Sequence, residues 1–147
     1  MVLKQMEDIS TKALRSSQIS YGELMKCAME ARKNSYSPYS GFKVGAALLC
    51  RDGKIYTGCN IENAAYSPTN CAERTAFFKA ISEGQREFLA IAVAGGREEL
   101  EPCYPCGVCR QVMAEFCDVE QFVIVCGTSE RDLEVFRLKE LLPKNFG

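Results

Sequence analysis

The amino-acid sequence predicts a single α/β domain with three layers, α/β/α, in which helices cover both faces of a mixed sheet of about five strands. Short apolar runs of strand length alternate with longer segments that carry apolar residues at helical spacing. The chain has 147 residues, the length of one domain, and contains no repeat and no linker rich in Pro, Gly or Ser. We therefore expect residues 1–147 to fold as one unit.

The N-terminal region is expected to supply an arm and one helix. Residues 1–19 are polar and weakly patterned, which indicates an N-terminal arm. Ser20 followed by Glu23 is a capping-box pattern, and such a pattern begins a helix. Four residues then recur at helical spacing: Leu24, Cys27, Ala28 and Ala31.

Strands and helices alternate over the rest of the chain. Lys43–Cys50 and Lys54–Ile61 are expected to form a hairpin through the turn residues between them. The elements expected next, in the order helix, strand, helix, strand, strand, are Cys71–Glu83, Leu89–Ala94, Cys106–Phe116, Gln121–Cys126 and Leu133–Leu138. A short tail from Leu142 to Gly147 closes the chain.

Composition and charge exclude several classes of protein. No apolar run approaches the roughly 18 residues that a membrane helix needs. Acidic residues occupy the N-terminus, where a signal peptide would carry apolar ones, so we expect a cytoplasmic protein without a membrane partner. The net charge is −1 and Lys and Arg are scattered, whereas a nucleic-acid binder usually has a basic face. A small-molecule substrate is therefore favoured over a nucleic acid.

Cysteine is abundant and histidine is absent. The chain has nine cysteines and no histidine, so catalytic schemes and zinc sites that depend on histidine are excluded. In a reducing cytosol, metal binding or catalysis explains such cysteines better than a disulfide framework. Any zinc must then be held by cysteine, with or without a carboxylate.

Cys106 and Cys109 form a C-x-x-C motif at an expected helix start, directly after Pro105. Residues three apart share one face of a helix, so both sulfurs can bind one ion. The positive end of the helix dipole also favours the thiolate form that a metal requires. Alone, the motif fits a redox pair as well as a metal site.

Cys71-Ala72-Glu73 shifts the balance towards a catalytic metal. This segment also falls at a helix start, so two helix ends could direct three thiolates at one centre. Three protein ligands leave one position of a tetrahedral zinc open, as in catalytic sites. The set carries one negative charge in excess of Zn²⁺, which Arg74 and Arg110 could offset.

Two alternatives concern neighbours of these ligands. Asn70 and Glu73 also match a capping box, in which Glu73 would only close a helix end. Cys103 could complete a closed structural site with four cysteines, but Tyr104 precedes a proline and is pushed out of the helical region, which takes Cys103 off the helix face. The other cysteines are expected to be small core residues: Cys27, Cys50, Cys59, Cys117 and Cys126.

Taken together, Cys71-Ala72-Glu73-Arg74-Thr75-Ala76 and Pro105-Cys106-Gly107-Val108-Cys109-Arg110-Gln111 resemble the cytidine deaminase family, over about residues 36–146. This resemblance implies a cytidine deaminase-like fold and hydrolytic deamination of cytidine and 2′-deoxycytidine to uridine and 2′-deoxyuridine plus ammonia, in pyrimidine salvage. It implies one zinc per chain, whose bound hydroxide attacks C4 of the base, and Glu73 as the proton shuttle. It also implies a homotetramer whose subunits share active sites.

The resemblance further implies which residues bind the nucleoside. Asn60 and Glu62 match the segment that binds the ribose, and Phe42 matches the aromatic residue that packs beside the nucleoside. The backbone at Ala72 would contact the base. Phe146 would stack on the base in a neighbouring subunit, with Tyr39 and Tyr66 lining the pocket.

Other functions remain open at this point. A deaminase of a related nucleoside such as blasticidin S would share the zinc site but would not need Asn60 and Glu62. A deaminase of polynucleotides would need a basic surface that the composition does not offer. A zinc-stabilised binding module would release no ammonia from cytidine.

Overall fold

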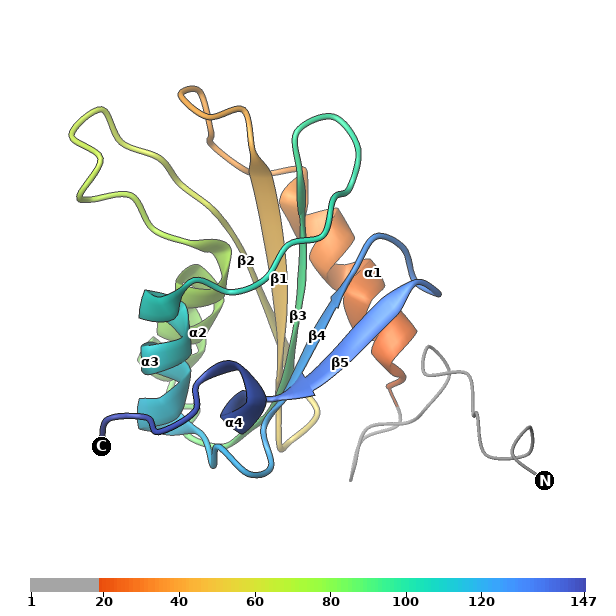
Figure 1. Cartoon of the computed structure of the whole chain (residues 1–147), viewed down its shortest axis with the longest axis vertical. Helices are drawn as coiled ribbons and strands as arrows, with labels where there is room; N and C mark the ends of the chain where they lie inside the picture. Colours follow the sequence, from red (N-terminus) through yellow and green to blue (C-terminus); the bar gives the residue numbers. More distant parts are fainter. Residues whose placement is uncertain (1–18) are drawn as a thin grey trace.

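The computed structural model describes residues 19–147, so the expected N-terminal arm lies outside the described residues except for Ile19. The described part of the chain contains a five-stranded sheet with helices on both faces, which confirms the predicted α/β/α layers (Figure 1). Its elements in chain order are α1 (Tyr21–Arg32), β1 (Lys43–Cys50), β2 (Ile55–Cys59), α2 (Ala72–Ser82), β3 (Phe88–Gly96), α3 (Gly107–Phe116), β4 (Val123–Gly127), β5 (Leu133–Arg137) and α4 (Leu138–Leu141).

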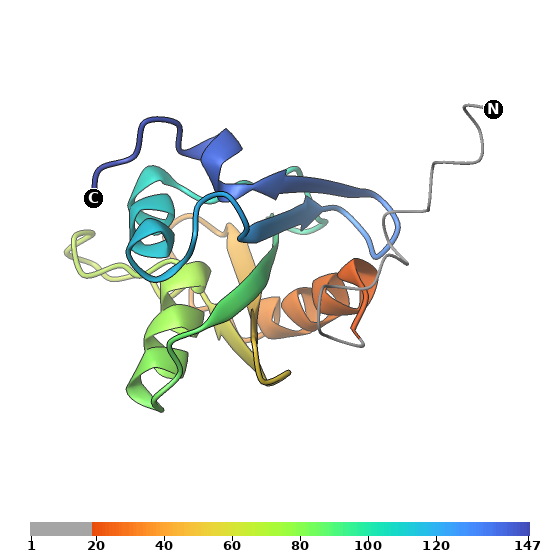
Figure 2. The same cartoon turned by 90° about the horizontal axis from the view of Figure 1, so that it is seen from below.

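The sheet is mixed and has the strand order β2-β1-β3-β4-β5. β1 pairs antiparallel with both β2 and β3, so β2 and β3 run in the same direction. β3 pairs parallel with β4, and β4 pairs antiparallel with β5. The helices α2 and α3 are therefore the crossover connections between parallel strands. Figure 2 shows both on one face of the sheet, with α1 on the other.

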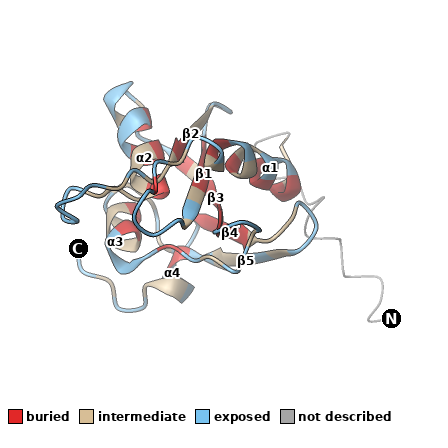
Figure 3. Cartoon of the chain, turned by 90° about the horizontal axis from the view of Figure 1, so that it is seen from above, coloured by how far each residue is buried: buried red, intermediate tan, exposed pale blue. Residues whose placement is uncertain are grey.

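Alternating side chains of the central strands separate two apolar cores. On β1, Ala46 and Leu48 belong to the core beneath α2 and α3, whereas Ala47 and Leu49 belong to the core beneath α1. This is the period-2 pattern of a strand that is buried on both faces. The central strands are correspondingly buried along most of their length (Figure 3).

The capping box predicted for α1 is confirmed. Glu23 N–H donates to Ser20 Oγ at 3.1 Å, and Ser20 N–H donates to Glu23 Oε2 at 2.8 Å. Of the residues predicted at helical spacing, Leu24, Ala28 and Ala31 are buried and Cys27 is half-buried. The amphipathic pattern therefore faces the sheet as expected.

The structure differs from the sequence prediction mainly near the C-terminus. The strand expected over Leu133–Leu138 ends at Arg137, and α4 begins at Leu138. The carboxylate of Glu140 accepts a hydrogen bond from Arg137 N–H at 2.9 Å, which closes this single turn. A helix of four residues is too short to show helical periodicity, so the sequence pattern did not reveal it.

Side chains of α2 cover the free edge of β2. Lys79 Nζ donates to the carbonyl of Thr57, and Thr75 Oγ1 donates to the carbonyl of Cys59 at 3.0 Å. Unpaired carbonyls at a sheet edge invite pairing with another chain. In this protein the neighbouring helix satisfies them.

Gly58 sets how closely α2 approaches the sheet. A Cβ atom on Gly58 would lie 2.4 Å from the carbonyl oxygen of Ala72 and 2.6 Å from the backbone N of Ala76. Both atoms belong to the backbone of α2, so no side-chain rotation could relieve the clash. The first turn of α2 therefore lies directly on β2.

Within residues 19–147, no helix is both long and apolar enough to cross a membrane.

We expect Gly58→Ala to lower the free energy of unfolding by about 1–3 kcal/mol or more, because the added methyl group has to push α2 away from the sheet. Chemical denaturation followed by circular dichroism measures this change. Gly107→Ala is the matched control, since a Cβ atom there meets nothing within 4 Å. Equal stability of the Gly58→Ala variant and the parent protein would contradict the close approach.

Candidate active site

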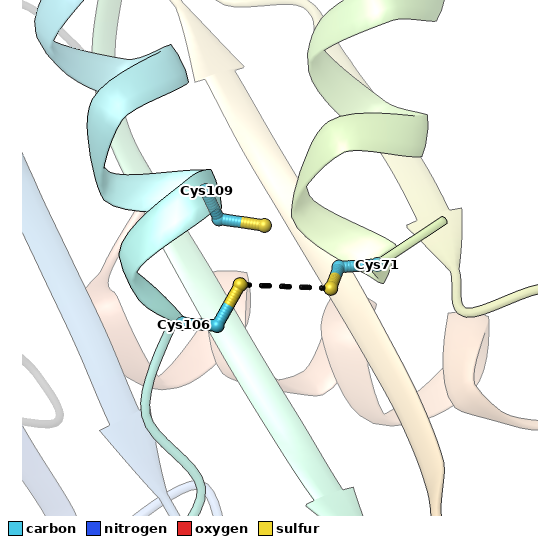
Figure 4. Close-up of side chains that lie close together, drawn as sticks. All are labelled: Cys71, Cys106 and Cys109. Atoms are coloured by element: carbon cyan, nitrogen blue, oxygen red, sulfur yellow. Dashed lines mark hydrogen bonds between the residues drawn. The ribbon is translucent and has the colours of Figure 1, made fainter. Parts of the chain in front are cut away.

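Three cysteines meet above one end of the sheet. Cys71 is the N-cap of α2, Cys106 is the N-cap of α3, and Cys109 lies in the first turn of α3. Their three Sγ atoms lie within 4.8 Å of one another, and Cys71 Sγ lies 3.8 Å from Cys106 Sγ (Figure 4). Cys109 is buried, Cys71 is half-buried and Cys106 is exposed, so the cluster is open to solvent on one side.

The geometry of this cluster fits a zinc ion. Two sulfurs bound tetrahedrally at about 2.3 Å from one zinc lie about 3.8 Å apart, and Cys71 and Cys106 have this spacing. Neither N-cap cysteine uses its sulfur to cap its helix, so both sulfurs are available as ligands. Among residues 19–147 this is the single group of three or more such ligand atoms, which agrees with one zinc per chain.

The charges around the cluster favour thiolate. Arg74 Nη2 donates to Cys71 Sγ at 3.2 Å. A hydrogen bond from Cys109, with a smaller effect of Arg74, lowers the pKa of the Cys71 thiol to about 5 despite its burial. The pKa of the Cys109 thiol is raised, because Cys109 shares its proton with Cys71 and is buried. Full ionisation of the cluster therefore needs a cation at its centre, and zinc with its preference for thiolate meets that need.

Of the two arginines expected to offset the thiolate charge, Arg74 makes a direct contact with a sulfur. Arg110 instead donates to two backbone carbonyls, those of Pro105 and Leu141, at 2.7 Å each. Arg74 follows Cys71 by three residues and so shares its face of the helix. Arg110 is adjacent to Cys109 in sequence and points in a different direction.

Glu73 lies in the first turn of α2, two residues after Cys71, and is 4% exposed. Burial is the main reason that the pKa of its carboxyl is raised to about 7. The alternative in which Asn70 and Glu73 form a capping box is wrong, because Cys71 is the N-cap and the Asn70 amide donates to Thr75 Oγ1 at 3.2 Å. Glu73 is thus a buried carboxyl group beside the cysteine cluster.

Cys103 lies outside the cluster. Its Sγ packs against β3, where a Cβ atom on Gly95 would lie 2.6 Å from it. Burial raises the pKa of its thiol to about 12, so the thiol stays protonated at neutral pH. The alternative with four cysteine ligands is therefore not formed in this structure.

The two residues expected at the ribose, Asn60 and Glu62, make hydrogen bonds within the chain. The Asn60 amide donates to the Phe42 carbonyl at 2.8 Å and accepts from Val44 N–H at 2.9 Å, which ties the end of β2 to the start of β1. The Glu62 carboxylate accepts from the N–H of Tyr39 at 3.0 Å and from the hydroxyl of Ser40 at 2.6 Å. These hydrogen bonds, that from Ser40 above all, lower the pKa of Glu62.

The sequence analysis did not foresee Ser40 as a partner of Glu62. The two residues lie in separate loops, 22 positions apart, so no local pattern links them. The turn-rich composition around Ser40 indicates only that a loop is present there.

The expected aromatic residues occupy different environments. Phe42 is half-buried, and the Arg97 guanidinium lies 5.8 Å from the centre of its ring. Tyr66 is 75% exposed, and its ring packs edge to face against that of Tyr39, with 6.4 Å between the ring centroids. Phe146 is 86% exposed, while its carbonyl accepts a hydrogen bond from Gln111 Nε2 at 3.2 Å. The structure therefore brings Ala72 and Glu73 to the cysteine cluster and leaves Tyr66 and Phe146 at the surface of the single chain.

A buried carboxyl group beside three converging cysteines, on an α/β/α fold, defines the class of zinc-dependent hydrolases with an open metal position. Residues 19–126 match the cytidine and deoxycytidylate deaminase zinc-binding region. A cytidine deaminase from Sporosarcina psychrophila is 53% identical over 124 residues, which cover 84% of this chain and 89% of that protein. A probable cytidine deaminase from Dictyostelium discoideum is 44% identical over 127 residues, 84% of each chain.

Solved structures of cytidine deaminases have the same fold as this chain. The crystal structure of cytidine deaminase from Burkholderia pseudomallei superposes with a TM-score of 0.80 and 46% identity, covering 87% of this chain and 100% of that one. That of cytidine deaminase from Mycobacterium tuberculosis gives a TM-score of 0.74 at 38% identity, covering 88% of this chain and 99% of that one. The chain belongs to the cytidine deaminase family, as its motifs predicted.

We expect Cys103→Ser to retain one zinc per chain, because the Cys103 sulfur faces β3 and not the metal site. Cys106→Ser should lose most of its zinc, since only two thiolates remain. Elemental analysis of the purified proteins gives the metal content. Loss of zinc from Cys103→Ser would mean that the site is closed by four cysteines.

Proposed function

We propose that this chain hydrolyses cytidine and 2′-deoxycytidine to uridine and 2′-deoxyuridine with release of ammonia, as a step of pyrimidine salvage in the cytoplasm. The observation that carries the proposal is the convergence of the Cys71, Cys106 and Cys109 sulfurs beside the buried carboxyl of Glu73. Membership of the cytidine deaminase family supports the substrate class. Nine free cysteines among the described residues fit a reducing compartment.

Cys71, Cys106 and Cys109 would hold zinc, which when bound would supply a Lewis acid and make water nucleophilic at neutral pH. Glu73 would move the protons: its carboxylate takes one proton from the attacking water and delivers it to N3 of the base. It then takes the second proton from the new hydroxyl on C4 and delivers it to the exocyclic amine, so that the C4–N bond breaks, ammonia leaves and C4 keeps the oxygen as a carbonyl. A buried carboxyl group with a pKa near neutrality can accept and return a proton within one turnover. Arg74 offsets part of the negative charge of the thiolates through its bond to Cys71.

The nucleoside is proposed to bind along the rim next to this centre. The N–H of Ala72, in the first turn of α2, has no acceptor within its own helix and can donate to the base. The Glu62 Oε2 atom accepts a single hydrogen bond within the chain, from Ser40, so it can also accept one from a ribose hydroxyl. The Asn60 Oδ1 atom already accepts from Val44 N–H and Ser35 Oγ, so Asn60 would use the second N–H of its amide to donate to a ribose oxygen. Phe42 packs beside the nucleoside, at the strand start that Asn60 holds in place.

We expect Glu73→Gln to keep its zinc and to lose activity, since the amide preserves the shape of the side chain and cannot shuttle protons. General acid-base catalysis alone contributes roughly 10²–10⁴-fold, so kcat should fall at least that far. Ammonia release from cytidine measures turnover, and elemental analysis measures zinc. Glu115→Gln, at an exposed position of α3, is the matched control.

Near-parental turnover of zinc-loaded Glu73→Gln would contradict the proposed role of Glu73. The same assay on the parent protein tests the function itself. Release of ammonia from blasticidin S and none from cytidine would favour a deaminase of a related nucleoside. Zinc binding without ammonia release from either compound would indicate a binding module.

We further propose that the active protein is a homotetramer in which each subunit completes the site of a neighbour. Phe146 and Tyr66 are 86% and 75% exposed in the single chain, and Tyr39 beside Tyr66 is 53% exposed. Exposed large aromatic side chains are enriched in protein interfaces. A phenyl ring stacked on a base contributes roughly 0.5–1.5 kcal/mol beyond its buried area, enough to affect substrate binding.

Removal of Phe146 and Gly147 should raise the KM for cytidine while zinc content stays unchanged, because the tail would no longer reach the neighbouring site. Mixing the truncated chain with Glu73→Gln should restore part of the activity, since each supplies what the other lacks. Steady-state kinetics measure both effects. An unchanged KM after truncation, or a fully active monomer in sedimentation, would show that sites are not shared.

A further inference from the structure

Arg110 connects the backbone directly before the expected zinc ligand Cys106 to the C-terminal segment, residues 138–147. Its Nε–H donates to the Pro105 carbonyl and its Nη1–H donates to the Leu141 carbonyl, both at 2.7 Å. The guanidinium is half-buried, and both bonds are short and charge-assisted. One side chain thus joins the residue before Cys106 to the last residue of α4.

The contact with Pro105 fixes the backbone that carries Cys106. The Pro105 carbonyl and the Cys106 N atom belong to the same planar peptide group. A hydrogen bond to this oxygen therefore fixes the orientation of the peptide plane that leads into Cys106. The ring of Pro105 fixes its own φ angle, and Pro105 is buried. The N–H of Arg110 also donates to the Cys106 carbonyl at 3.0 Å. The Arg110 side chain thus holds the peptide plane before the Cys106 Cα atom, and the main-chain bond of α3 holds the plane after it. Only the side-chain bond is lost when Arg110 is replaced.

Cys106 depends on its backbone more than the other two ligands do. Cys109 is buried in the apolar core, and Cys71 is half-buried with Arg74 bonded to its sulfur. Cys106 is exposed, and its sulfur lies 3.8 Å from the sulfur of Cys71. Few side-chain contacts restrain Cys106 Sγ, so its direction follows from the peptide planes around it.

The C-terminal segment is anchored to the rest of the fold by apolar packing, so Arg110 binds a fixed partner there. Leu138 in α4 is buried, and Leu141 and Leu142 pack against the core beneath α2 and α3. Gln111, the residue after Arg110, donates to the Phe146 carbonyl at 3.2 Å. Two successive residues of α3 thus bind the segment that follows β5.

From these contacts we infer that Arg110 is a positioning residue for the zinc ligand Cys106, and that it couples the strength of zinc binding to the docking of α4. The inference rests on Cys106 being a zinc ligand. Arginine suits this task because its planar fork reaches two carbonyls at once, whereas the single ammonium of lysine cannot reproduce both directions. Partners that orient metal ligands in this way typically change metal affinity 10–100-fold when they are lost.

The test compares Arg110→Gln with the full-length parent protein. Competition with a chromogenic chelator gives the zinc dissociation constant, which should rise about 10–100-fold. Replacement of zinc by Co²⁺ gives a thiolate-to-metal charge-transfer band, which should weaken or shift because Cys106 is no longer aligned. The matched control is Arg86→Gln, since Arg86 also donates to two backbone carbonyls, those of Ile81 and Gln85, at 2.8 Å each.

Unchanged zinc affinity and an unchanged cobalt spectrum in Arg110→Gln would overturn the inference. An equal loss of affinity in Arg86→Gln would overturn it too, because the effect would then be general. Should Arg110→Gln fail to fold, Arg110→Lys decides by the same criteria, with an intermediate affinity expected since one carbonyl can still be bound. A parent protein that binds no zinc would instead overturn the proposed function and this inference with it.

Discussion

The site depends on the handedness of two crossover connections. β2 connects to β3 through α2, and β3 connects to β4 through α3, in both cases between parallel strands and in the same direction across the sheet. Right-handed crossovers in one direction place both helices on the same face. Both helices also start where parallel strands end, so their N-termini lie at the same edge of the sheet. Cys71 and Cys106 meet for this reason, although they lie 35 positions apart in the sequence.

The same arrangement determines the electrostatics of the centre. Two helix N-termini direct their dipoles at one point, which favours thiolates there. The third sulfur, that of Cys109, reaches the same point because it lies three residues after Cys106. Glu73 is buried in the first turn of α2 beside the cysteines, and this burial raises the pKa of its carboxyl group. Topology therefore supplies both the metal site and a proton carrier beside it.

Local sequence patterns predicted the structural features that depend on residues close together in the chain. The capping box at Ser20, the C-x-x-C of α3 and the order of the elements are of this kind. Such patterns could not predict contacts between distant loops, such as the hydrogen bond from the Ser40 hydroxyl to the Glu62 carboxylate. The contacts of Arg110 show the same limit. Arg110 directly follows the ligand Cys109, yet its partners lie in the loop before α3 and on α4, and no periodicity predicted these contacts.

The covered edge of β2 has a consequence for assembly. Lys79 and Thr75 occupy carbonyls that an added strand would need, so the sheet cannot continue into another molecule along this side. A partner has to dock instead on helices and loops, where Tyr39, Tyr66 and Phe146 offer apolar surface. The fold therefore blocks one route by which sheet proteins grow into fibres, the addition of a strand at β2.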